Sequence, residues 1–310
     1  MRLVMETPLR RTLALGAASV IGVMVLFGGI DHVFDSGPVH ELPPLSPQTT
    51  SEERVIVNDP KRLDRLFDKA GYELSSVRAG AAMVPLMLVR DLPDGFDELG
   101  DSDVRKTLFI RTVLPLVLRV NLRIAAQRKV LLALLDKRRA GTELTRREQR
   151  GLEQMARLYR TRPDSDATLR RRVAPIPPSL AIAQAAAETG WGSSRFAQRG
   201  NALFGQWTFN DKDDGMKPAK ADSGSRHQVK AYDRLVESAW DYARNLNTNA
   251  AYRALREARA RGERSGIALA GHLVRYSERG MAYVELLRRI IRQNDLAALD
   301  GAKIANRPPR

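Results

Sequence analysis

Residues 173–194 read VAPIPPSLAIAQAAAETGWGSS, and in a chain that is 28% charged their only ionisable side chain is Glu188. The alanine, leucine and isoleucine residues predict a helix over 179–189 beside apolar partners, and Gly190 and Gly192 signal its end. A carboxyl near the end of such a helix that faces a cleft loses hydration in its charged form, so its pKa rises. A general acid at neutral pH needs that raised pKa. The alternative is a helix-terminal glutamate that points into water.

The composition limits the partners and cofactors of the chain. Its 310 residues can bury a sizeable core, and its formal net charge is +15, carried mostly by arginine. A basic surface suits nucleic acid, an anionic membrane or an acidic polymer, and a compositional drift toward arginine explains it equally well. No zinc-finger spacing, RNP-like run or basic zipper is present, so nucleic acid is not predicted as a partner. Without cysteine or HExxH spacing of histidines, we expect no metal and no cofactor.

The N-terminal 35 residues predict a signal anchor. Leu13 to Ile30 (LALGAASVIGVMVLFGGI) is an uncharged run of 18 residues, at the lower edge of what spans a bilayer. Arginines precede this run and acidic residues follow it, which keeps the N-terminus in the cytoplasm and exports the rest. A cleaved signal peptide is the alternative, although the run exceeds the usual apolar region and no clean A-x-A site ends it.

Residues 36–100 are predicted to be a linker followed by a poorly defined segment. The first part is rich in Pro, Ser, Thr and Glu, which favours a semi-rigid spacer. Residues 60–71 have helical spacing of apolar side chains between a proline and a glycine. Residues 77–89 are apolar without a clear period, which is compatible with an extended segment.

Residues 101–172 predict a helical region ahead of the catalytic core. A long apolar period over 103–139 indicates a helix in which Pro115 can introduce a kink. The basic side chains of this helix are interpreted as a solvated face. Thr145 and Glu148 have the spacing of a capping box, which opens a second helix.

Residues 173–300 predict a mainly helical catalytic domain with one small β element, followed by a tail over 301–310. Residues 211–224 are typical of a loop, residues 226–233 alternate enough for a hairpin strand, and Asp233 is a candidate N-cap. Further helices are predicted over 234–247, 250–261, 267–276 and 281–293.

Four stretches resemble one family. They are FIRTVLPLVLRVN (109–121), PIPPSLAIAQAAAETGWGSSRFAQRGNALFGQW (175–207), KAYDRLVESAWDYARNLNTNAAYRALR (230–256) and YSERGMAYVELLRRII (276–291). The segment that contains them, about 106–294, resembles the glucosaminidase domain of bacterial Bax-type proteins, which are relatives of glycoside hydrolase family 73. The motifs ETGWG, NALFGQW and NLNTNAAY occur in the order and spacing of that family.

The resemblance implies a mainly α (α+β), lysozyme-like fold with two helical lobes and a small β-hairpin. It also implies hydrolysis of β-1,4 bonds after N-acetylglucosamine in peptidoglycan. Glu188 matches the catalytic acid of the family and Tyr252 its cleft tyrosine. The flanking motif matches at Trp191, Asn201, Phe204 and Gly205, and Trp207 follows it. The aromatic residues could stack on sugars, and Tyr252 could orient the N-acetyl group or water, but Tyr252 and Trp191 also suit the core, and Asn201 could simply hold its loop.

One departure from the family concerns the second carboxylate. Many relatives carry it on the hairpin, but no glutamate occurs between Thr189 and Val236. Aspartates in this region are expected to be solvated in turns: Asp211, Asp213, Asp214 and Asp222. A two-carboxylate mechanism therefore cannot be assigned, and assistance by the acetamido group of the substrate stays open.

Three functions compete on these grounds. The leading one is a membrane-anchored endo-N-acetylglucosaminidase that acts on peptidoglycan glycan strands from the periplasmic side of the bacterial inner membrane, held there by residues 13–30. The second is a lytic transglycosylase or muramidase, because lysozyme-like folds share a single acidic glutamate at a helix end. The third is a wall-binding scaffold with weak activity. An amidase classification is also conceivable, although no metal or cysteine apparatus for amide cleavage is present.

Overall fold

The computed structural model describes residues 54–100, 102–208, 214–217 and 228–309. The predicted membrane segment 13–30 lies outside these ranges, and within them no helix has both the length and the apolar character needed to cross a bilayer. The elements are β1 (Arg54–Val55), α1 (Pro60–Lys69), α2 (Leu74–Arg78), β2 (Leu88–Val89), α3 (Ser102–Arg139), α4 (Arg146–Leu158), α5 (Asp166–Arg172), α6 (Pro178–Thr189), α7 (Arg195–Gly200), β3 (Trp207–Thr208), β4 (Gly215–Met216), β5 (Gln228–Lys230), α8 (Leu235–Thr248), η2 (Ala250–Tyr252), α9 (Arg253–Ala260), α10 (Gly266–Ala270), η3 (Val274–Tyr276), α11 (Met281–Gln293) and η4 (Ala297–Leu299).

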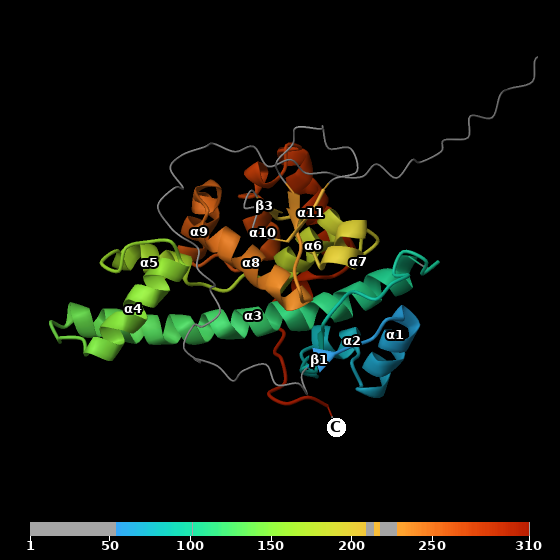
Figure 1. Cartoon of the computed structure of the whole chain (residues 1–310), viewed down its shortest axis with the longest axis horizontal. Helices are drawn as coiled ribbons and strands as arrows, with labels where there is room; N and C mark the ends of the chain where they lie inside the picture. Colours follow the sequence, from blue (N-terminus) through green and yellow to red (C-terminus); the bar gives the residue numbers. More distant parts are fainter. Residues whose placement is uncertain (1–53, 101, 209–213, 218–227, 310) are drawn as a thin grey trace, which may run out of the picture.

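The long helix α3 runs along the molecule, with α6 and α8 packed on one side and α1 on another (Figure 1). Its segment from Leu108 to Leu118 is buried on every face, because elements from both ends of the chain cover it. The helix continues through Pro115. The prediction that its basic side chains form a solvated face is wrong at Arg111, which is only 5% exposed.

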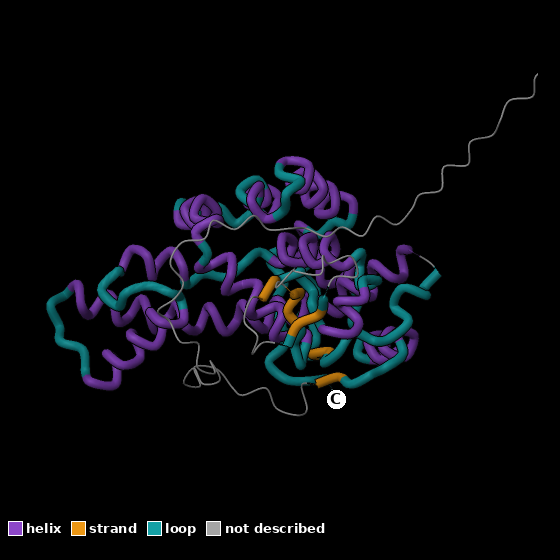
Figure 2. The backbone as a smooth tube through the Cα atoms, turned by 45° about the horizontal axis from the view of Figure 1, so that its top comes forward, coloured by secondary structure: helices purple, strands orange, loops and turns teal. Residues whose placement is uncertain are grey.

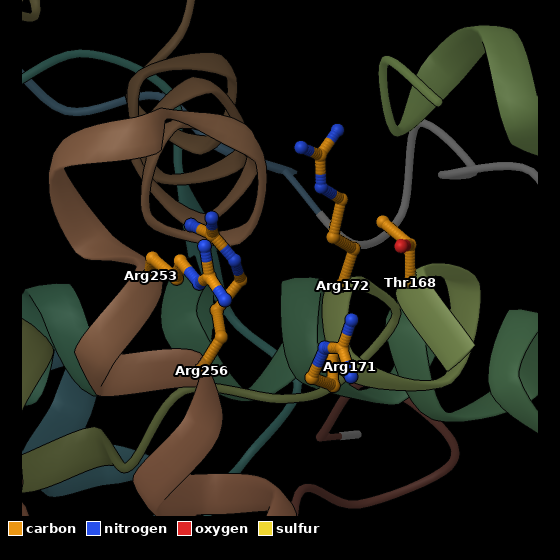
Figure 3. Close-up of a pocket in the computed structure, with 5 residues that line it drawn as sticks. All are labelled: Thr168, Arg171, Arg172, Arg253 and Arg256. Carbon is orange, nitrogen blue, oxygen red and sulfur yellow. The ribbon is translucent and has the colours of Figure 1, made fainter. Parts of the chain in front are cut away.

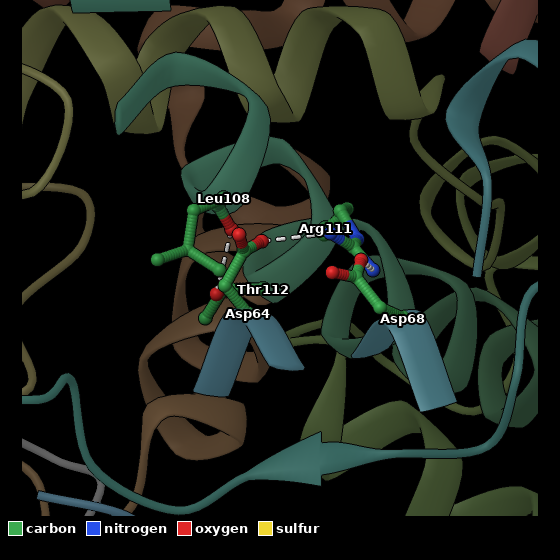
Figure 4. Close-up of polar contacts among 5 residues, drawn as sticks. All are labelled: Asp64, Asp68, Leu108, Arg111 and Thr112. Carbon is green, nitrogen blue, oxygen red and sulfur yellow. Dashed lines mark hydrogen bonds and ion pairs between the residues drawn. The ribbon is translucent and has the colours of Figure 1, made fainter. Parts of the chain in front are cut away.

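Arg111 connects α3 to the N-terminal helix α1 (Figure 4). Its guanidinium donates to Asp64 and to Asp68, each over 2.8 Å, and these aspartates lie one helical turn apart on the same face of α1. The same guanidinium lies over the rings of Phe67 and Tyr72, at 5.0 and 5.5 Å from their centroids. Burial of this arginine is therefore compensated by two charges and two aromatic faces.

Residues 54–100, the described part of the predicted linker and of the poorly defined segment after it, pack into the same hydrophobic core as the rest of the chain. Strands β1 and β2 pair in parallel, and Val84 forms a β-bridge with Ile304 near the C-terminus. The predicted extended stretch 77–89 is therefore partly helix and partly β structure. These pairings join distant segments, so a local pattern could not reveal them.

Helices α4 and α5 fold back on the second half of α3 as an arm of the molecule (Figure 1). The predicted capping box is confirmed: the backbone N–H of Glu148 donates to Thr145 Oγ1, and the backbone N–H of Thr145 donates to Glu148 Oε2. In the arm, the Tyr159 hydroxyl donates to Gln127 Oε1 on α3 over 2.7 Å. Helix α5 was not predicted.

The remaining elements surround α6, which packs against α3, α10 and α11. The predicted hairpin strand is β5, the middle strand of a small antiparallel sheet in the order β3-β5-β4 (Figure 2). The N-cap of α8 is Arg234 instead of Asp233. The predicted helices over 250–261 and 267–276 are each divided into a 3-10 turn and a short α-helix. The mainly helical class with a small sheet is confirmed.

Candidate active site

Glu188 lies in the last turn of α6, a helix with small side chains that is buried over most of its surface. Alanines let neighbouring helices approach the backbone closely, so the environment of the carboxyl is apolar. The helix ends at Gly190, which has φ 57°, a left-handed conformation that favours glycine. Thr189 secures the turn: its hydroxyl donates to the Ala185 carbonyl and accepts from the N–H of Gly192. The position of the carboxyl is thereby fixed by the backbone.

The Glu188 carboxyl has a single described side-chain donor, Tyr283 of α11. The Tyr283 hydroxyl donates to Glu188 Oε1 over 2.7 Å. Burial raises the pKa of Glu188 to about 7, and the Tyr283 hydrogen bond and the charge of Arg279 only partly oppose this effect. A large share of the Glu188 side chains therefore carries a proton at neutral pH, as the sequence predicted for a general acid.

A chain of hydrogen bonds leads to this carboxyl from the protein interior. The Tyr242 hydroxyl donates to Gln184 Oε1 over 2.7 Å, and Gln184 Nε2 donates to the Tyr283 hydroxyl over 3.2 Å. Each member thus donates to the next, and the last proton of the chain points at Glu188 Oε1. The transferable proton of Glu188 is therefore assigned to the other oxygen, Oε2.

Gly205 lies beside that second oxygen. A Cβ atom at this position would lie 3.2 Å from Glu188 Oε2. The backbone at Gly205 has φ 58°, which a residue with a side chain adopts at a cost. Both observations place the Gly205 backbone beside Glu188 Oε2, where a side chain would crowd the carboxyl.

Tyr252 is completely buried, and together with Tyr242, Tyr276 and Tyr283 it forms a group of buried tyrosines, called the tyrosine group below. The ring of Tyr252 lies 5.9 Å from that of Tyr276, which in turn stacks on Tyr283 at 5.6 Å with nearly parallel planes. Burial raises the pKa of Tyr252, a hydrogen bond with Asn245 opposes the rise, and the charge of Glu188 adds to it. Tyr252 is therefore close enough to sense the carboxyl, while its hydroxyl is not exposed to solvent in this conformation.

Three residues of the predicted substrate-binding set hold the structure together. Trp191 packs edge-on against Phe109 of α3, with ring centroids 5.8 Å apart. Phe204 is buried and stacks on Tyr242 at 3.9 Å, so it presents no face to a sugar here. Asn201 ends α7 with φ 51°, and its Nδ2 donates to Asp91 and to the carbonyl of Tyr232.

Trp207 is the remaining aromatic residue of the predicted set. It lies on β3 opposite Val229 and stays partly exposed. Sugar stacking by this side chain remains a prediction.

Of the four aspartates weighed as a second carboxylate, Asp214 alone falls within the described residues, and it is exposed. Within those residues, no three His, Cys, Asp or Glu side chains gather in a way that could hold a metal ion.

Tyr283, Tyr276 and Gln184 were not among the predicted site residues. One signal was available for Gln184, because it precedes Glu188 by four residues and therefore shares its face of the helix. The sequence around Tyr283 did not indicate a place in the site, since an aromatic residue on a predicted amphipathic helix is normally interpreted as part of the hydrophobic core.

Comparison with known proteins gives two matches. The family model Glucosaminidase, described as mannosyl-glycoprotein endo-beta-N-acetylglucosaminidase, matches residues 167–296. The chain is also similar to "Protein bax" of Escherichia coli (strain K12), with 32% identity over 205 residues that span 61% of this chain and 70% of that protein. No solved structure matches the chain. The family match contains Glu188 and every tyrosine of the buried group.

Proposed function

Because this chain belongs to the Bax-type glucosaminidase-domain proteins, a family of glycosidase type, we propose that it hydrolyses peptidoglycan as an endo-N-acetylglucosaminidase. The observation that carries the proposal is the single carboxyl of Glu188, held by Tyr283 and protonated to a large extent at neutral pH. The substrate, a β-1,4-linked glycan with N-acetyl groups, is the part of the proposal that rests on family likeness.

In the proposed reaction, Glu188 Oε2 gives its proton to the glycosidic oxygen as the bond to the anomeric carbon breaks. The leaving sugar departs as an alcohol, and Glu188 is left as a carboxylate. The Tyr283 hydrogen bond to Oε1 stabilises that carboxylate, because a hydroxyl donor favours the charged form. Tyr283 thus lowers the energy of the state that follows proton transfer.

The positive charge at the anomeric carbon needs a partner, and we propose the acetamido group of the substrate. Its carbonyl oxygen would attack the anomeric carbon as the glycosidic bond breaks, and water would then open the resulting ring. This choice is supported by the lack of a glutamate between Thr189 and Val236 and by the exposed position of Asp214, the one candidate aspartate within the described residues, since a solvated turn carboxylate is poorly fixed in geometry. Tyr252 contributes through the ring stack that supports Tyr283, instead of by contact with the substrate.

A lytic transglycosylase is the second candidate, and one observation favours it. That reaction needs a single acid, since a hydroxyl of the substrate itself attacks the anomeric carbon, and Glu188 is the carboxyl to which Tyr283 donates. The products distinguish the two reactions: a reducing N-acetylglucosamine end for the hydrolase, and an anhydro-muramic end for the transglycosylase.

The location of the protein is a separate proposal that rests on residues 13–30. We propose a single-pass anchor in the inner membrane with the catalytic domain in the periplasm. Membrane fractionation tests it: the protein should stay with the membrane through high-salt and alkaline washes and leave it in detergent. Release of intact protein by the washes alone would refute the anchor.

Digestion of purified sacculi tests the catalytic proposal. The wild-type protein should release fragments with reducing N-acetylglucosamine ends, identified by mass spectrometry after borohydride reduction. Glu188→Gln should lower the rate by about 10²–10⁴, because it keeps the shape and the Tyr283 contact while removing the transferable proton. A variant that retains more than about a tenth of the wild-type rate would remove Glu188 from the role of acid.

A further inference from the structure

A pocket lined by arginine, to which Glu188 does not contribute, lies between α5 and α9 (Figure 3). It has a volume of about 260 Å³. Helix α5 contributes Thr168, Arg171 and Arg172, and helix α9 contributes Arg253 and Arg256. These five residues are called the arginine pocket below. Four guanidinium groups around one hollow are an unusual arrangement, because like charges at short range repel.

The protein itself neutralises little of this charge. In the described part of the chain, the arginine pocket has one ion pair, between Arg253 and Glu257 over 2.8 Å, and it lies at a largely exposed side chain. Arg172 and Arg256 instead donate to backbone carbonyls, which fixes their guanidinium groups but leaves them cationic. Burial, followed by the charges of Arg172 and Arg171, lowers the pKa of Arg256 to about 10.

Helix direction acts differently on the two walls of the pocket, because Arg171 and Arg172 lie in the last turn of α5, the end of a helix that favours cations. Arg253 and Arg256 lie in the first turn of α9, the end of a helix at which the dipole favours negative charge. The dipole of α9 does not stabilise an arginine at this end. An anion bound between the arginines would interact favourably with the dipole and with the guanidinium groups. A carboxylate matches the paired N–H groups of a guanidinium, and the Thr168 hydroxyl supplies a further donor.

The chain connects this pocket to the catalytic group. Arg253 directly follows Tyr252, whose ring contacts Tyr276, which stacks on Tyr283, the donor to Glu188. The start of α9 therefore has the buried tyrosines on its inner side and the pocket on its outer side.

We propose that the arginine pocket binds a carboxylate of the peptide stems that branch from the peptidoglycan strand. The identity of the ligand rests on the proposed function, since peptidoglycan is the wall glycan with carboxylate-bearing peptides. The pocket then selects strands with free stem carboxylates and adds affinity outside the bond that is cut.

Isothermal titration calorimetry on the full chain in detergent tests this proposal. The probe is the stem tetrapeptide L-alanyl-γ-D-glutamyl-meso-diaminopimelyl-D-alanine, compared with its fully amidated form. The free acid should bind wild type and Glu188→Gln equally, and at least about tenfold more tightly than the amide. Arg171→Gln and Arg253→Gln should each weaken binding of the acid by about tenfold. Both side chains are largely exposed, so these variants should fold.

Arg261→Gln is the matched control, because it removes an exposed arginine from the other end of α9. It should bind the tetrapeptide as wild type does. Equal binding of acid and amide, or undiminished binding in both pocket variants, would overturn the proposal. Binding of inorganic phosphate that depends on Arg171 and Arg253, with no binding of the tetrapeptide, would overturn the assignment to stem peptides. Tetrapeptide binding by a protein that leaves sacculi uncut would refute the proposed function and keep the peptide site.

Discussion

The Tyr283 hydroxyl on α11 donates to Glu188 Oε1 on α6 over 2.7 Å, across 95 residues of sequence. The bond has a fixed direction, because Gln184 Nε2 already donates to the same hydroxyl. Tyr283 therefore favours the charged carboxylate, whereas burial favours the neutral acid, and the pKa of about 7 results from both. A general acid benefits from this balance, since it must hold a proton and also release it.

Tyr283→Phe should raise the pKa of Glu188 further, because it removes a donor that stabilises the carboxylate. The acid would then keep its proton to higher pH. The alkaline limb of the kcat/KM profile, expected near pH 7 in wild type, should move upward, and kcat should fall because the carboxylate product is less stable. A profile of sacculus digestion over a range from mildly acidic to alkaline pH measures this. A limb that moves to lower pH would contradict the assigned direction of the bond.

Glu188→Gln should stabilise the protein at alkaline pH. The carboxyl has a pKa of about 7 when folded and 4.5 as its ordinary value, so the folded state binds more protons between these pH values. The free energy of unfolding of wild type therefore falls as pH rises from 4.5 to about 7 and is level above that. At about pH 8 the variant should be more stable by about 2 kcal/mol, and near pH 4.5 the two should be equal.

Urea denaturation at about pH 4.5 and about pH 8 measures the difference, with similar m-values as a control for the unfolded state. The new amide oxygen in the Glu188→Gln variant can still accept the hydrogen bond of Tyr283, so packing is preserved. A stability difference that does not change with pH would show that burial does not raise the pKa of Glu188.

Gly205→Ala should impair catalysis more than stability. The added methyl group would lie 3.2 Å from Glu188 Oε2, where the substrate oxygen must approach. Gly71→Ala is a matched control: Gly71 has a similar φ of 65° and nothing within 4 Å of an added Cβ. Both variants should lose about 1 kcal/mol of unfolding free energy, the cost of a left-handed residue with a side chain. Only Gly205→Ala should also lose at least about tenfold in kcat/KM on sacculi.

Local patterns predicted those features that local interactions create. The helix of Glu188, its glycine end and the capping box of Thr145 depend on neighbouring residues, and each was predicted from sequence alone. The donor to Glu188 depends on how α11 packs on α6, and the bridge between Val84 and Ile304 pairs residues that are 220 positions apart in the sequence. The sequence around Tyr283 or Val84 does not indicate which distant residue each one contacts, because these contacts arise from the tertiary fold.

Phe204 illustrates the same limit within the site. Its position in a family motif favoured contact with sugar, but the side chain stacks on Tyr242 and is buried. A side chain that packs against the buried tyrosines restricts the residue type at its position, and so does a side chain that contacts the substrate. Sequence alone therefore cannot separate the two roles.

Arg111→Gln should destabilise the fold, although Arg111 lies outside the site. Its guanidinium is buried between Asp64 and Asp68, and the substitution leaves both carboxylates without their partner. The aspartates are partly exposed, so water compensates in part, and we expect a loss of about 2 kcal/mol of unfolding free energy. Arg65→Gln is the control, because this arginine of α1 is 69% exposed and its contact with Asp59 is 4.0 Å long. That variant should stay within about 0.5 kcal/mol of wild type.

Thermal unfolding of both variants, followed by circular dichroism, decides whether residues 54–100 unfold together with the domain that contains Glu188. If they are, Arg111→Gln should lower the single transition of the whole protein, because α1 and α3 share one core. An early partial transition, with the main one unchanged, would instead mean that the N-terminal segment unfolds by itself. Leu92 and Phe96 favour the first outcome: they lie 3.2 and 2.9 Å from where a Cβ on Gly192 would be, directly behind the turn that ends the helix of Glu188. Loss of that support should therefore displace the Glu188 carboxyl as well as the N-terminal helix.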